Sequence, residues 1–339
     1  MVSGFALFLG LFNNLALYII LVAAYGFLNA RIPRGPGAAG VRRQAVLGLV
    51  FGLFVIGFMQ VKIPVFKGVL VDQRNSVVIL SGAFGGPLSV ALTASIAAAY
   101  RAIHAIQPEA RVGFALNYRD LQPARPGFPP DQWMANLQSQ IYNNSFAGAI
   151  KTGKLDAVLK KVAVPEAKGT QDYLGINYYT CDLVKFDLTA PGDMFGRRST
   201  PPGAEMSETG FIASVPEGIF RALHWARQFD VPLFVSENGV EDSDDHLRPK
   251  YLVEHLEQVW RAANYNYRVE GYYHWSLVDN FEWERGWTQR FGLWGLDLNT
   301  QARIRRPSAS LYEAICRENG ISYEMVERWA PKALERIFK

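Results

Sequence analysis

The sequence predicts an α/β domain that follows a membrane-like segment, and two observations carry this prediction. From about Arg101 onward, short apolar runs alternate with amphipathic stretches, which is typical of βα units around a parallel sheet. Residues 1–100 instead contain long apolar runs and a single acidic side chain, Asp72. We therefore expect a membrane segment over residues 1–100 and a folded α/β domain over residues 101–339.

The front segment contains three apolar runs, Gly4–Leu28, Gln44–Val61 and Val77–Tyr100. A helix rises about 1.5 Å per residue, so about 20 apolar residues cross the hydrocarbon core of a bilayer. The first two runs are long enough, but Gly85-Gly86-Pro87 interrupts the third and would kink or divide its helix. The sequence thus predicts two or three transmembrane helices, with a lipid bilayer as a partner.

Basic side chains set the predicted orientation of this segment. Arg31, Arg34, Arg42 and Arg43 lie in the first loop, and the positive-inside tendency places such a loop in the cytoplasm. With three crossings, the chain is a multi-pass protein of the plasma membrane whose C-terminal domain lies in the cytoplasm. If the third run does not cross, that domain lies outside.

Charge and cysteine content exclude several classes of function for the back domain. Residues 101–339 carry 28 basic and 30 acidic side chains without a basic stripe, so nucleic acid is not an expected partner. The two cysteines, Cys181 and Cys316, lie far apart and have no His or Cys nearby at metal-ligand spacing. We expect no metal site, no disulfide framework and no cofactor.

The elements of the back domain follow from its hydrophobic pattern. Four short apolar runs are predicted as strands: Val112–Leu116, Tyr173–Tyr179, Leu233–Ser236 and Gly271–Leu277. Longer amphipathic stretches are predicted as helices: Gln132–Ile150, Pro216–Phe229, Pro249–Ala263, Ser308–Glu318 and Tyr323–Phe338. Together they predict four βα units.

Each predicted strand ends in polar and aromatic residues that are unusual for a core. The first three strands close on Asn117-Tyr118-Arg119, Asn177-Tyr178-Tyr179 and Ser236-Glu237-Asn238-Gly239, and the fourth runs through an aromatic and acidic segment, 272–283. In a barrel of βα units the carboxyl ends of the strands build the active site. Aromatic rings pack on the C–H face of a sugar and carboxylates accept its hydroxyls, so these strand ends predict a carbohydrate site.

The motifs at these strand ends resemble those of family 1 glycoside hydrolases, which are mostly β-glucosidases and β-galactosidases. They are Leu-Gly-Ile-Asn-Tyr-Tyr-Thr at 174–180, Ser-Glu-Asn-Gly at 236–239, His-Trp-Ser-Leu-Val-Asp-Asn-Phe-Glu-Trp at 274–283, Arg-Phe-Gly-Leu at 290–293 and Arg-Arg-Pro-Ser-Ala at 305–309. The resemblance begins at about residue 101 and implies the second half of a (β/α)₈ TIM barrel. The first 100 residues resemble part of the five-transmembrane region of LytS-type sensor kinases. The residues that carry this resemblance are Val71–Asn75 and Gly85-Gly86-Pro87.

The resemblance implies a retaining β-glycosidase that acts on O-glycosidic bonds. Glu237 would be the nucleophile that attacks the anomeric carbon. Tyr179 would donate a hydrogen bond to it, and Asn177 would help to orient the site.

Four further side chains would bind the sugar. Glu282 would accept hydroxyl groups of the non-reducing sugar and Trp283 would lie alongside it. Trp275 and Phe291 would form apolar walls. A β-glycoside or another carbohydrate is therefore the expected partner.

The sequence lacks the second catalytic carboxyl group that the resemblance implies. A retaining glycosidase needs a proton donor about 5–5.5 Å from its nucleophile, and the family carries it in an Asn-Glu-Pro segment. This sequence has no such segment and no Glu before Glu109. We expect hydrolysis to be absent or severely impaired. Because four strands cannot close a barrel of eight, self-association is one way to cover the open half-barrel.

Two alternatives remain open from the sequence. The chain could be a membrane sensor or sugar-binding protein without catalysis, in which a membrane anchor presents a degenerate sugar site. It could instead be a fusion of two unrelated genes, joined near Ala97–His104, where a helix of small residues fits either family.

Overall fold

The computed structural model describes residues 63–66, 69–71, 87–157 and 160–338, and these fall into two compact units. One unit holds the described residues up to Ala110 together with Gln140–Thr170. The other holds Arg111–Ser139 and the residues from Gln171 onward. The predicted domain boundary after residue 100 stays a prediction, and a helix, α4 (Pro87–Ile106), runs across it.

In the first unit, α4 packs against the helix α6 (Ser145–Thr152) and the short 3-10 helix η2 (Pro165–Ala167). The left-handed residue Gly153, with φ of 71°, ends α6 and donates its N–H to the carbonyl of Ala149. Two hairpins and a π-helical turn complete the unit: β1 (Ile63–Phe66), β2 (Val69–Val71), β5 (Lys154–Ala157), β6 (Lys160–Ala163) and η1 (Gln140–Asn144).

The predicted location in the plasma membrane is wrong. Among the residues that the structure describes, no helix has both the length and the apolar character that a bilayer crossing requires. In the third apolar run, α4 begins only at Pro87 and reaches Arg101 before its end, so its uncharged part is shorter than about 20 residues. The first two runs, Gly4–Leu28 and Gln44–Val61, lie outside the described residues.

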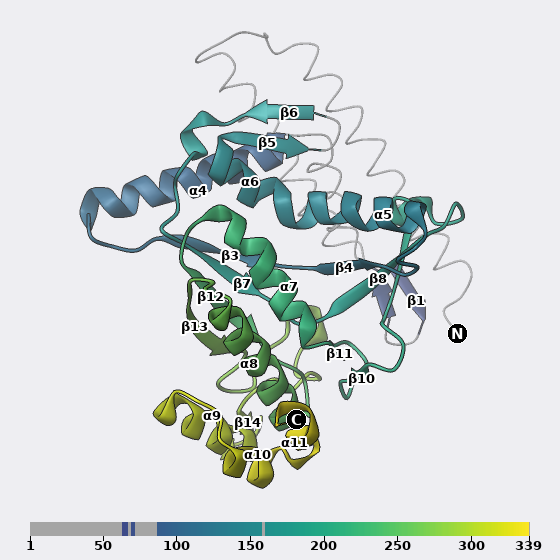
Figure 1. Ribbon diagram of the computed structural model, residues 1–339, viewed down its shortest axis with the longest axis vertical. Coiled ribbons are helices and arrows are strands. Elements are labelled where there is room, and N and C mark those ends of the chain that lie inside the picture. The colour runs from purple at the N-terminus through teal and green to yellow at the C-terminus, as the bar shows by residue number, and fades with distance from the viewer. Residues whose placement is uncertain (1–62, 67–68, 72–86, 158–159, 339) are drawn as a thin grey trace. The chain divides into compact units, whose positions relative to one another are not determined.

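The second unit is built on a parallel sheet of four strands in the order β13-β12-β7-β3 (Figure 1). Each strand falls on a run that the sequence predicts as a strand, so these four strands are confirmed: β3 (Gly113–Asn117), β7 (Tyr173–Asn177), β12 (Leu233–Asn238) and β13 (Val269–His274). Leu174, Ile176, Leu233 and Val235 are fully buried or nearly so. These alternate positions form the core face of the sheet.

Helices α7 (Glu217–Ala226) and α8 (Arg248–Asn264) pack against each other, and they contact β7 and β13, respectively. The buried side chains of α7 include Ile219, Ala222 and Leu223, at the spacing of one helix face. Figure 1 shows both helices on one side of the sheet. They connect consecutive parallel strands, as a parallel sheet requires.

Three C-terminal helices share a core with α8 that includes Leu252, Leu311 and Val326. They are α9 (Pro307–Glu318), α10 (Tyr323–Trp329) and α11 (Leu334–Ile337). The predicted helix Tyr323–Phe338 is broken in the structure, because Pro331 starts a separate 3-10 turn.

Smaller elements surround the sheet of the second unit. The helix α5 (Pro129–Ser139) packs on a three-stranded sheet of order β4-β8-β9, and buried Asp131 holds it there by accepting from Arg125 and from the backbone N–H of Phe186. The remaining elements are β4 (Asp120–Pro123), β8 (Cys181–Phe186), β9 (Gly196–Ser199), β10 (Glu205–Met206), β11 (Ala213–Ser214), β14 (Trp294–Leu296), β15 (Arg303–Arg305) and the 3-10 helices η3 (Pro191–Asp193), η4 (Arg227–Phe229), η5 (Trp283–Arg285) and η6 (Pro331–Ala333).

A buried ion pair ties the segment after β12 to the start of α9. The carboxylate of Asp245 pairs with the guanidinium of Arg248, and both side chains are almost completely buried. Asp245 also accepts from the backbone N–H of Ser308 at 2.6 Å and from its hydroxyl at 2.7 Å. Burial holds the pKa of Arg248 below its ordinary value, so this cation depends on its partner.

We expect Asp245→Ala to lower the free energy of unfolding by about 3–5 kcal/mol, because it leaves a buried guanidinium without its counter-charge. Urea unfolding followed by circular dichroism measures the change. Asp244→Ala is the matched control, since the neighbouring side chain is 64% exposed. Equal effects of the two substitutions would contradict the assignment.

Candidate active site

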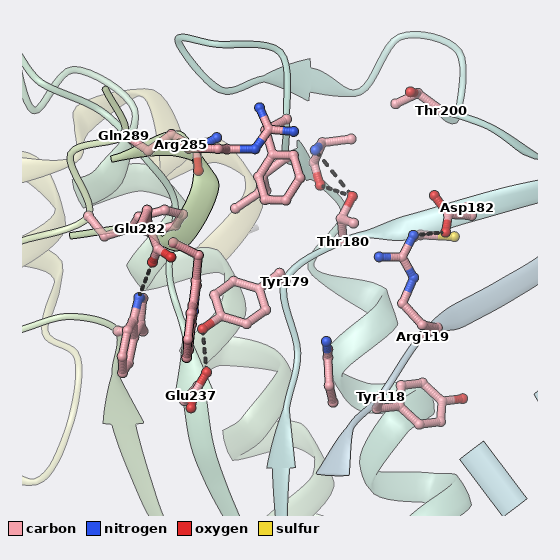
Figure 2. Close-up of a pocket in the computed structure, with 18 residues that line it drawn as sticks. Tyr118, Arg119, Tyr179, Thr180, Asp182, Thr200, Glu237, Glu282, Arg285 and Gln289 are labelled. Atoms are coloured by element: carbon pink, nitrogen blue, oxygen red, sulfur yellow. Dashed lines mark hydrogen bonds and ion pairs between the residues drawn. The ribbon is translucent and has the colours of Figure 1, made fainter. Parts of the chain in front are cut away.

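A pocket of about 440 Å³ lies at the carboxyl ends of β3, β7 and β12, where the sequence predicts a site (Figure 2). Its walls are aromatic and polar. Six of the seven predicted site residues line it: Tyr179, Glu237, Trp275, Glu282, Trp283 and Phe291. The strand register brings them together, because the carboxyl ends of neighbouring parallel strands meet at one edge of the sheet.

Glu237 lies near the end of β12, where it pairs with Asn177 of β7. The hydroxyl of Tyr179 donates to Oε2 of Glu237 at 2.5 Å, and Figure 2 shows the two side chains pointing toward each other. Burial and the Glu237 carboxylate together raise the pKa of Tyr179 well above its ordinary value. Tyr179 therefore remains protonated and acts as a fixed donor to the carboxylate.

The structure places Asn177 outside the lining of the pocket. Its Oδ1 accepts from the hydroxyl of Ser236 on the neighbouring strand at 2.7 Å. This bond fixes the two strand ends beside Glu237. The predicted role of Asn177 in orienting the site stays a prediction.

Glu282 also lines the pocket, and two hydrogen-bond donors hold its carboxylate in place. The indole N–H of Trp275 donates to its Oε1 at 3.2 Å, and the amide of Asn280 donates to the same oxygen at 3.1 Å. Phe291 is only 3% exposed, whereas Trp283 is 78% exposed. The wall thus combines a positioned carboxylate, a buried ring and an open indole face.

Gly239, the last residue of the Ser-Glu-Asn-Gly motif, is required because another backbone segment passes close to it. A Cβ at this position would lie 1.8 Å from the carbonyl oxygen of Trp275. The backbone N–H of Trp275 in turn donates to the carbonyl of Asn238 at 2.9 Å. Only glycine lets the strand that carries Glu237 pass this close to the segment that carries Trp275.

A chain of three hydrogen-bonded hydroxyl and amide groups supports Tyr179, and the sequence did not predict it. Tyr251 donates its hydroxyl to the carbonyl of Tyr179 at 2.9 Å. The amide of Asn238 donates to the hydroxyl of Tyr251 at 3.0 Å, and the hydroxyl of Tyr272 donates to Oδ1 of Asn238 at 2.8 Å. The available signals were Asn238 in the Ser-Glu-Asn-Gly motif and Tyr272 in the aromatic and acidic segment 272–283.

Charged lining residues beyond the predicted set are Arg119, Asp182 and Arg285. Arg119 follows β3 and forms an ion pair with Asp182 (Figure 2). Its position directly after a predicted strand was a usable signal, whereas Asp182 and Arg285 carried none.

The acidic side chains of the lining do not include an unengaged second carboxyl group beside Glu237. Asp182 is paired with Arg119, and Glu282 accepts from Trp275 and Asn280. Within the described part of the chain, no three His, Cys, Asp or Glu side chains gather at metal-binding distance. The pocket lining therefore contains three described carboxylates, Asp182, Glu237 and Glu282, and each of them has a hydrogen-bond or ion-pair partner.

A model of glycosyl hydrolase family 1 matches residues 89–321. The chain belongs to this family. The motifs at 174–180, 236–239 and 274–283 lie within the match, and the family predicted from them is confirmed. A second model, described as the 5TMR of 5TMR-LYT, matches residues 36–107, where the sequence resembles a sensor-kinase membrane region.

Curated family 1 relatives include a β-galactosidase of Sulfolobus acidocaldarius, which is 37% identical over 238 residues, or 68% of this chain and 47% of the relative. A 1,4-beta-D-glucan glucohydrolase of Thermotoga neapolitana is 37% identical over 169 residues, or 46% of this chain and 37% of the relative. This chain spans about half the length of the curated relatives that it matches.

Among solved structures, a β-glycosidase from Pyrococcus horikoshii aligns with a TM-score of 0.68 and 26% identity. The alignment covers 85% of this chain and 68% of that one. The α/β fold of a family 1 TIM-barrel glycosidase is thus supported by sequence and by structure.

A buried imidazole beneath the site predicts a pH-dependent stability. His255 stacks on Tyr251 with ring centroids 3.7 Å apart, and burial lowers its pKa to about 3. Between this value and the pKa of about 6.5 of an unfolded histidine, only the unfolded state binds the proton. The contribution of His255 to stability is therefore present above pH 6.5 or so and is lost as the pH falls.

We expect the free energy of unfolding to fall between about pH 6.5 and pH 4, with His255 contributing up to about 1.4 kcal/mol per pH unit. His255→Gln, which keeps an amide donor for the carbonyl of Tyr251, should reduce this slope in urea titrations at several pH values. His246→Gln, in a side chain that is 79% exposed, is the control. An unchanged slope in His255→Gln would refute the prediction.

Proposed function

We propose that this chain is a retaining β-glycosidase homologue in which Glu237 is the nucleophile. The observation that carries the proposal is the 2.5 Å hydrogen bond from Tyr179 to Glu237 inside the pocket. The bond orients one carboxylate oxygen and leaves the other for attack on an anomeric carbon. The names of the curated relatives, a β-galactosidase and a glucan glucohydrolase, support a β-glucoside or β-galactoside as the substrate class.

We assign sugar binding to the other predicted residues. Glu282, held by the Trp275 indole, would accept two neighbouring hydroxyls of the non-reducing sugar. The open indole of Trp283 would lie along the ring, and Phe291 would close the apolar wall. Asn177 would keep the strand ends of β7 and β12 in register.

We further infer that the four strands make up half of a family barrel, which takes eight. The sequence contains no Asn-Glu-Pro segment, where family 1 enzymes are expected to carry the acid/base. General-acid assistance is worth about 10²–10⁴-fold, so ordinary alkyl glycosides would turn over at most very slowly. Hydrolysis would be confined to substrates whose leaving group needs no proton.

With such a substrate, the first step of the reaction needs no proton donor. An oxygen of Glu237 forms a bond to the anomeric carbon, and the bond from that carbon to the leaving oxygen breaks. The leaving oxygen keeps the electron pair and departs as a stabilised phenolate. The glycosyl ester on Glu237 then persists, because no carboxylate activates the water that would hydrolyse it.

We expect 2,4-dinitrophenyl β-glucoside or β-galactoside to release a burst of phenolate, while the matching methyl glycoside is not hydrolysed. Intact-mass measurement of the full chain should find one added hexose, and peptide mapping should place it on Glu237. Azide, a nucleophile that needs no general base, should raise the steady-state rate several-fold and give a β-glycosyl azide.

Glu237→Gln should abolish the burst and the added mass. Glu327→Gln, at an exposed position on α10, is the matched control. A burst that survives Glu237→Gln would exclude Glu237 as the nucleophile. Hydrolysis of the methyl glycoside at a normal rate would mean that a proton donor exists.

A further inference from the structure

The outer part of the pocket combines a cation with exposed aromatic rings, and we propose that it binds an aromatic aglycone that carries a carboxylate. The site consists of Arg285 and Phe211, and it borders Trp283, whose indole the proposed function gives to the sugar. The inference rests on the proposed function, because it names the class of leaving group that the same pocket would accept.

Arg285 has a charge that the pocket does not neutralise. Its guanidinium carbon lies 4.4 Å from the centroid of the Phe211 ring, and its side chain is exposed. Among the described residues, no carboxylate lies within ion-pair distance of it. Arg119, the other arginine of the lining, differs in this respect because Asp182 offsets its charge.

The position of Arg285 separates it from Glu237. Figure 2 shows Tyr179 between Arg285 and Glu237. Glu282 and Glu237 make the inner end acidic, which suits neutral hydroxyls and disfavours an anion. A negatively charged group would therefore be accommodated at the outer end.

The aromatic surface specifies what should carry the negative charge. Phe211 is 50% exposed although it lines the pocket. A planar ring would cover the exposed part of Phe211, and a guanidinium can stack on an aromatic ring while its fork binds a carboxylate. A flat aromatic acid satisfies both features, whereas an alkyl acid would leave the Phe211 ring uncovered.

The test compares 4-carboxyphenyl and 4-carbamoylphenyl β-glycosides, which have the same shape and differ in charge. Isothermal titration of the full chain should give about 5- to 10-fold tighter binding of the carboxylate at low salt. Arg285→Gln should remove this preference, so that the two glycosides bind with similar affinity. Arg303→Gln, at an exposed position on β15, is the matched control.

Free 4-hydroxybenzoate, which has no sugar, separates this inference from the proposed function. If hydroxybenzoate binds in an Arg285-dependent way but the amide glycoside does not bind, the result supports the outer site and contradicts the proposed sugar site. If the amide glycoside binds and the carboxylate adds nothing, the outer site is overturned and the sugar site holds. Absence of binding by all three ligands would overturn both.

Discussion

The parallel pairing of β7 with β12 is the constraint on which the rest of the site depends. The backbone N–H of Tyr178 donates to the carbonyl of Glu237 at 2.9 Å, so the two strands remain paired up to their carboxyl ends. This pairing places Tyr179 two residues beyond the end of β7 and within reach of the Glu237 carboxylate. Val235 pairs with Ile176 and Glu237 pairs with Asn177, so a register shift between Val235 and Glu237 takes Glu237 out of the alternation that Leu233 and Val235 follow.

The electrostatics of the pocket are uneven, and this follows from where each charge is compensated. Glu237 and Glu282 accept hydrogen bonds from neutral donors, which orient a carboxylate without neutralising it. Asp182 is compensated by Arg119. Under the proposed function, an electron-rich inner end would suit the oxocarbenium-like charge that develops when a glycosidic bond breaks. It would not help the departing oxygen, which must either gain a proton or leave as a stabilised anion.

Much of this arrangement could be predicted from the sequence, because short apolar runs and their polar ends are local features. All four strands of the parallel sheet and six of the pocket-lining residues followed from such runs and motifs. The orientation of Asn177 toward Ser236 could not be predicted, since it depends on a partner 59 positions away. Arg285 over Phe211 is a contact between the short 3-10 helix η5 and the connection from β10 to β11, for which sequence periodicity carries no information.

Hydrogen bonds through Tyr272, Asn238 and Tyr251 connect the C-terminal helices to Tyr179, which donates to Glu237. Tyr272 packs against the core that α8, α9 and α10 share, so these bonds link the packing of that core to the position of Tyr179. Substitutions in the C-terminal helices would consequently alter, from a distance, the hydrogen bond that Glu237 accepts.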